Sequence, residues 1–71
     1  MANEQLEQIA ESVRFMDSEI GKVKQMIRVL RNAGEDTSAV VMKLNPAIFK
    51  TEKLRDSLAK EGIKIPKTYV D

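Results

Sequence analysis

Apolar residues in the first half of the chain recur at alternating spacings of three and four residues. This is the a/d pattern of a coiled coil, in which an apolar stripe on one helix packs against another helix. The positions are Leu6, Ile9, Val13, Met16, Ile20, Val23, Ile27 and Leu30. A shorter series in the second half consists of Val40, Leu44, Ala47, Thr51, Leu54 and Leu58. In an antiparallel hairpin the two series align, with Ile27 opposite Leu44 and Val13 near Leu58. We therefore expect an all-α fold, an antiparallel helical hairpin with coiled-coil-like packing that assembles into a helical bundle.

Residues that end or interrupt helices divide the chain further. Gly34 and Gly62 are placed to follow helix ends, because glycine adopts the left-handed conformation at little cost. Pro46 lacks a backbone N–H and disfavours helical geometry in the residue before it, so we expect a helix break at Asn45 and Pro46. If the kink there is mild, the two pieces form one bent arm. The predicted elements are helices over about 4–33, 37–44 and 46–61 and an extended tail over 63–71.

The predicted tail contains two apolar residues, Ile63 and Ile65, before Pro66. In an antiparallel hairpin these residues return toward the start of the first helix, so we expect them to cover Leu6 and Ile9. Chain ends are often poorly held, and we expect residues 67–71 to be loose.

The chain has 71 residues and contains neither cysteine nor histidine. We expect one domain, 1–71, and a domain this small is marginally stable unless it is cross-linked or associated. Disulfides are excluded and the usual zinc ligands are missing, so we expect no metal and no cofactor. No apolar run approaches the roughly 20 residues of a membrane span, and the acidic start differs from a secretory signal. We expect a cytoplasmic protein without a membrane span.

Several apolar residues fall outside the two main stripes. On the first predicted helix, Phe15, Met26, Val29 and Ala33 form a second stripe. On the other arm, the residues off the register are Val41, Ile48, Phe49 and Ala59. They could form an interface for another chain, or the 37–44 helix could fold back across the first helix and cover Phe15, Met26 and Val29 within a small three-helix core. We favour the interface, because a lone hairpin of this size is rarely stable. The expected partner-binding residues are Phe15, Met26, Val29, Ile48 and Phe49.

Charge is segregated along the first predicted helix. Residues 1–20 carry five acidic side chains and one basic side chain, whereas residues 21–34 carry four basic side chains and no acidic one. Two copies of this helix packed antiparallel would bring opposite charges together, but pairing through the main stripe could place Glu19 against its own copy. The expected partner is therefore a second copy, in a homodimer, or a larger complex in which this chain is an accessory subunit.

Basic side chains also share helix faces. Lys24, Arg28 and Arg31 lie on one face, and Lys50, Lys53 and Lys60 lie on another. Such faces could contact phosphates, so nucleic-acid binding is the alternative function. The net charge is only +1, whereas phosphate binding favours a strong basic excess. We therefore rank nucleic-acid binding second.

Catalysis finds little support in the sequence. No histidine is present for acid–base chemistry, and so short a chain has little bulk for a sheltered cleft. The three glycines stand alone and do not form a phosphate-binding loop. We expect a non-enzymatic protein–protein interaction module, either an oligomerising helical hairpin or a small accessory subunit of a larger assembly.

Overall fold

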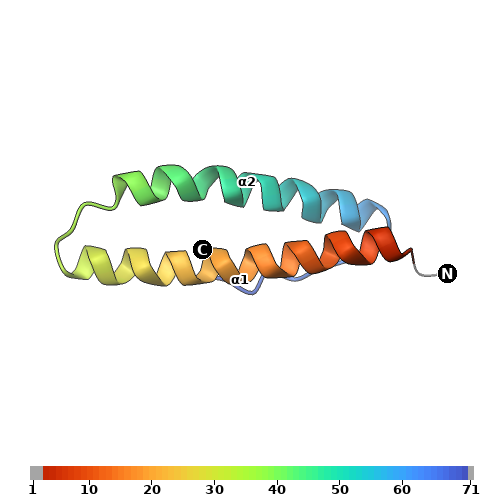
Figure 1. Cartoon of the computed structure of the whole chain (residues 1–71), viewed down its shortest axis with the longest axis horizontal. Helices are drawn as coiled ribbons and strands as arrows, with labels where there is room; N and C mark the ends of the chain where they lie inside the picture. The colour runs from red at the N-terminus through yellow and green to blue at the C-terminus, as the bar shows by residue number, and fades with distance from the viewer. Residues whose placement is uncertain (1–2, 71) are drawn as a thin grey trace.

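The computed structural model describes residues 3–70 and consists of two antiparallel α-helices followed by an extended tail (Figure 1). Helix α1 spans Glu4–Asn32 and helix α2 spans Ser38–Lys60. The two helices pack lengthwise in a body that measures 51 × 16 × 16 Å. The all-α hairpin predicted from the heptad pattern is confirmed.

Both helices begin and end at residues that suit those positions. The Asn3 side chain accepts hydrogen bonds from two backbone N–H groups in the first turn of α1. Gly34 (φ 82°) and Gly62 (φ 87°) adopt the left-handed conformation just after α1 and α2. At the start of α2, Asp36 accepts hydrogen bonds from the Ser38 hydroxyl at 2.6 Å and from the Ser38 N–H at 2.9 Å. These hydrogen bonds lower the pKa of the Asp36 carboxyl.

Helix α2 continues through Pro46, so the break predicted at Asn45 and Pro46 does not occur. Pro46 cannot donate a hydrogen bond to the carbonyl of Met42, and both residues lie on the exposed side of α2. Water can bond a carbonyl on that side of a helix. On the opposite side, Leu44 and Ile48 pack into the core and hold the helix across this point. The two helices predicted for this arm are therefore one.

The buried apolar residues form two clusters along the hairpin. The cluster distant from the helix–helix loop contains Ala10, Val13, Leu58 and Ile65. The cluster nearer the loop contains Ile20, Ile27, Leu44 and Tyr69. Val13 meets Leu58 and Ile27 meets Leu44 within these clusters. The antiparallel register that the heptads predict is therefore the one observed.

The tail packs on the hairpin and runs back along α1 (Figure 1). Ile63 and Ile65 cover the cluster at the start of α1, as predicted, although Ile9 stays 38 % exposed. The expectation that residues 67–71 are loose is wrong for the described part, because Tyr69 is buried. Asp71 lies outside the described residues. Tyr69 passes over Gly21, and a Cβ atom added to this glycine would lie 3.6 Å from the Tyr69 Cβ.

The docked tail shifts the buried face of α1 away from the centre of the predicted stripe. Ala10 and Asp17 are buried although neither belongs to that stripe. Met16 and Val23 belong to it, yet they are only half-buried. One edge of the stripe is therefore covered by the tail, and the other edge is left open.

Candidate functional site

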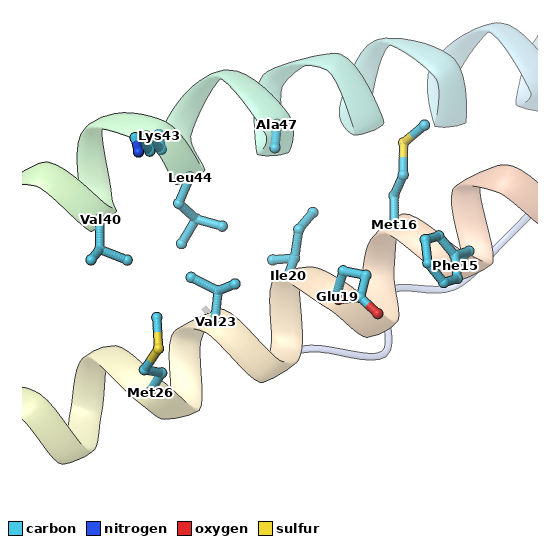
Figure 2. A pocket seen from close by; sticks show the side chains of 10 residues that line it. All are labelled: Phe15, Met16, Glu19, Ile20, Val23, Met26, Val40, Lys43, Leu44 and Ala47. Carbon is cyan, nitrogen blue, oxygen red and sulfur yellow. The ribbon is translucent and has the colours of Figure 1, made fainter.

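The open edge of the hairpin is an apolar groove between the halves of α1 and α2 that adjoin the loop (Figure 2). The groove has a volume of 490 Å³, and the tail passes behind α1, away from it. All lining residues are apolar except Glu19 and Lys43. The lining consists of Phe15, Met16, Glu19, Ile20, Val23, Met26, Val40, Lys43, Leu44 and Ala47. We call this feature the groove.

The floor and rims of the groove differ in exposure. Ile20 and Val23 of α1 point toward Leu44 of α2 and form the floor (Figure 2). The rims are formed by Phe15, Glu19 and Met26 on α1 and by Lys43 on α2. Phe15 is 66 % exposed and Met26 is 46 % exposed. Large apolar side chains thus stand in water beside an apolar floor, an arrangement typical of a binding surface.

The five predicted partner-binding residues are not all brought together. Phe15 and Met26 line the groove. Val29 is exposed but lies outside the lining. Ile48 is half-buried against the cluster near the loop, and the exposed Phe49 does not line the groove. Of the five predicted residues, the structure therefore places only Phe15 and Met26 in the groove.

The heptad pattern predicts that the residues of the groove floor pack only in the seam between the two helices. Val23, Val40 and Leu44 do pack at the seam, but their outer edges line the groove as well. Heptad spacing identifies the stripe and cannot indicate which of its edges stays open. The second stripe predicted on the first helix, which begins at Phe15, was the only sequence signal for the groove.

A buried ion pair separates the two core clusters. The Asp17 side chain is fully buried and accepts hydrogen bonds from Arg55 Nη2 at 2.7 Å and from Nη1 at 3.1 Å. Arg55 Nη1 also donates to the carbonyl of Ile65 at 3.1 Å. The hydrogen-bonded Asp17 carboxylate raises the pKa of Arg55. The pair therefore joins α1, α2 and the tail at one point, and it is part of the fold rather than of the groove.

Sequence reasoning missed this pair, although the sequence held a signal for it. Asp17 continues the three-four spacing of Ala10, Val13 and Ile20, so an acidic residue stands within an apolar stripe. The observed register brings Arg55 opposite this position. A charge at such a position is stable only when paired, which would have pointed to a basic residue on the other helix.

Glu52 on α2 holds the end of the tail. It accepts a hydrogen bond from the Tyr69 hydroxyl at 3.2 Å and lies 3.3 Å from Lys67 Nζ. Lys24 Nζ lies 5.3 Å from the centroid of the Tyr69 ring, on the α1 side. Burial, together with the hydrogen bond to Glu52, raises the pKa of Tyr69.

The direction of this shift predicts how the protein responds to alkaline pH. Tyr69 has a higher pKa in the folded protein than the value of about 10 in an unfolded chain. Its contribution to stability is therefore complete below that pH and is lost as the pH rises through the folded-state value. The charged groups around the hydroxyl and ring are Glu52, Arg55, Lys24 and Lys67.

We expect the ultraviolet absorbance of tyrosinate to titrate at higher pH in the native protein than in urea. Because the chain contains one tyrosine, no other residue contributes. A Tyr69→Phe variant should lose the part of the alkaline destabilisation that this titration causes. Equal midpoints in the folded and unfolded protein would contradict the docking of the tail.

The two predicted basic sets lie apart. Lys24, Arg28 and Arg31 line a hollow beside Val70, and the α2 lysines do not. Arg31 Nε donates to Thr37 Oγ1 at 3.2 Å. The second predicted set consists of the α2 residues Lys50, Lys53 and Lys60. Lys53 Nζ lies 4.7 Å from the centroid of the Phe49 ring. The structure therefore does not join the two sets in one hollow.

Within residues 3–70, no group of three or more histidine, cysteine, aspartate or glutamate side chains lies close enough to hold a metal ion. Neither α1 nor α2 is long and apolar enough to cross a membrane.

The fold and the site together define a helical hairpin with one side covered by its own tail and the other side open as an apolar groove. Comparisons with protein-family models, curated proteins and solved structures find no match to this chain.

Proposed function

We propose that this protein is a non-enzymatic interaction module that binds another polypeptide in its groove, as an oligomerising hairpin or as an accessory subunit of a larger assembly. The observation that carries the proposal is the open groove, with Phe15 and Met26 exposed on its rim. Burying such apolar surface against a partner is favourable because it is removed from water.

The shape of the groove suits a helix as its occupant. It follows the helix axes from the level of Phe15 to that of Met26, a distance of about 16 Å or three helical turns. An amphipathic helix can place apolar residues along such a groove at spacings of three and four. Glu19 on one rim and Lys43 on the other favour a partner that carries a base and an acid at matching places.

Photo-crosslinking tests this proposal with a matched pair of aromatic positions. Phe15 and Phe49 are similarly exposed, at 66 % and 63 %, but only Phe15 lines the groove. We expect photoreactive benzoylphenylalanine at position 15 to form a specific crosslink to a polypeptide in an extract of the native cells. The same group at position 49 should not form that crosslink. Equal labelling from both positions, or none, would contradict the proposal.

A second pair of substitutions separates binding from folding. Met26→Glu places a charge on the groove rim and is expected to remove the crosslink from position 15. Met42→Glu is the matched control, because Met42 is 75 % exposed and lies outside the groove. Both variants should keep the helix content measured by circular dichroism. Loss of helix content in Met26→Glu alone would assign this residue to the fold.

Nucleic-acid binding is the second candidate, and one observation favours it. Lys24, Arg28 and Arg31 line one hollow, in a half of α1 that carries no acidic residue. Binding of a labelled oligonucleotide should then fall steeply with salt, and Arg28→Glu should weaken it. If the partner is instead a protein that binds in the groove, Arg28→Glu should leave its binding unchanged, because Arg28 does not line the groove.

A further inference from the structure

We infer that the partner seated in the groove is a second copy of this chain, with the two α1 helices packed antiparallel about a two-fold axis between residues 20 and 21. This inference rests on the proposed function and names its partner. It is carried by the pattern of exposed side chains along the face of α1 that borders the groove, and by the position of Phe15 on the groove rim.

The exposed side chains along one face of α1 are complementary to the same side chains of a second α1 helix that runs in the opposite direction. The stripe has alternating spacings of four and three and consists of Gln8, Ser12, Phe15, Glu19, Lys22, Met26, Val29 and Ala33, all exposed. When a second copy runs in the opposite direction, Phe15 faces Met26 and Glu19 faces Lys22. A pair of opposite charges then lies on each side of the axis, and an apolar pair lies beyond each of them. This is the reciprocal matching that a two-fold interface requires.

Other alignments of two α1 helices fit less well. Pairing through the main stripe, with Val13 against Val23, is excluded because Val13 is fully buried by the hairpin itself. A parallel alignment of the exposed stripe would place Glu19 against Glu19 and Lys22 against Lys22. Like charges in such positions are destabilising, so the charges favour the antiparallel alignment.

The antiparallel alignment also brings an aromatic side chain of the second copy to the groove. Phe15 of the second copy arrives at the level of Met26, beside the floor residues Val23 and Leu44. Its exposed ring can enter the apolar groove there, and the symmetry makes the same contact a second time. Exposed aromatic side chains that enter a pocket of the partner commonly provide most of the affinity of an interface.

Light scattering across a range of protein concentrations tests self-association directly. We expect a dimer that dissociates on dilution. Phe15→Glu should weaken the dimer on the order of a hundredfold, because both copies of the anchoring contact are lost. Phe49→Glu is the matched control and should leave the dimer unchanged, since Phe49 lies outside the groove. A dimer that resists Phe15→Glu would overturn the proposed interface.

Charge exchange tests the pairing of Glu19 with Lys22. Glu19→Lys and Lys22→Glu should each weaken the dimer about tenfold, because an attraction becomes a repulsion at two symmetric places. The double variant should recover the original affinity. The ion pair between these residues within one chain is exposed, at 3.5 Å, and its loss should not change helix content. Failure of the double variant to recover would contradict this register.

Disulfide formation tests the direction of the two helices, and the cysteine-free chain makes the readout clean. In the antiparallel dimer Ser12 faces Val29, whereas the two copies of Ser12 are about 25 Å apart along the helix. A mixture of Ser12→Cys and Val29→Cys chains should therefore form a mixed disulfide, and neither variant alone should cross-link. Cross-linking of each variant by itself would show a parallel dimer and overturn the inference.

The outcomes distinguish this inference from the proposed function. A folded monomer at all concentrations would overturn self-association. If position 15 then crosslinks a different polypeptide, the groove is a binding site for another protein and the proposed function stands. A monomer that also forms no crosslink from position 15 would overturn both.

Discussion

Asp17→Ala is expected to destabilise the folded protein by about 3 to 5 kcal/mol. The substitution leaves the guanidinium of Arg55 with 12 % of its side chain exposed and without its carboxylate partner. Arg55 Nη1 would retain only the carbonyl of Ile65, and Nε lies 3.8 Å from Glu52 Oε1. These contacts do not replace the two charge-assisted hydrogen bonds that Arg55 donates to the buried Asp17 carboxylate. For so small a domain, this loss is a large part of the total stability.

Urea unfolding followed by circular dichroism, at one protein concentration, measures the effect. Glu11→Ala is the matched control, because Glu11 and Arg14 form an exposed ion pair at 2.8 Å on the same helix. Removing that pair should cost less than about 1 kcal/mol. A loss of that same small size for Asp17→Ala would show that the Asp17 pair is solvated and would contradict its burial.

A double-mutant cycle isolates the interaction between the two charges. Arg55→Met alone leaves the Asp17 carboxylate buried and unpaired, so it should destabilise the protein about as strongly as Asp17→Ala. The double variant Asp17→Ala with Arg55→Met removes both charges and should be more stable than either single variant. Additive losses would contradict direct pairing.

Ile65→Ala is the second large effect, with an expected loss of about 2 to 5 kcal/mol. Ile65 is 6 % exposed and packs with Ala10, Val13 and Leu58. Shortening this side chain removes apolar contacts and leaves a cavity between the tail and both helices. The expected loss of stability measures the contribution of the docked tail, because the substitution leaves all direct contacts between α1 and α2 unchanged.

Val70→Ala provides the control for this prediction. Val70 is also an aliphatic residue of the tail, but it is 78 % exposed. Its replacement should change the free energy of unfolding by less than about 0.5 kcal/mol. If Ile65→Ala were equally mild in urea unfolding, the tail would not be docked in solution, and the covered side of the hairpin would be a second open surface.

The tail and the groove together make the two sides of the hairpin unequal. Ile65 and Tyr69 cover one side, where the ion pair and Glu52 hold the tail in place. The other side presents the groove. A partner that binds in the groove would therefore approach the hairpin from the side that the tail leaves open.

Local sequence signals predicted the antiparallel helical hairpin and the outer ends of its two arms. The heptad spacing predicts amphipathic helices because apolar residues recur with the period of the helix. Gly34 and Gly62 marked the ends of the helices because the observed left-handed conformation favours glycine. The antiparallel register followed as well, since matching the two stripes pairs Ile27 with Leu44 and Val13 with Leu58.

The tertiary structure decided the features that depend on contacts between distant segments. Helix α2 continues through Pro46 because Leu44 and Ile48 pack on the opposite side, which a local rule for proline does not include. Asp17 is buried because Arg55 and the tail meet it there. The periodicity of α1 defines one apolar stripe but not which edge of it is covered. That choice is made by residues 63–70, which cover one edge and leave the groove along the other.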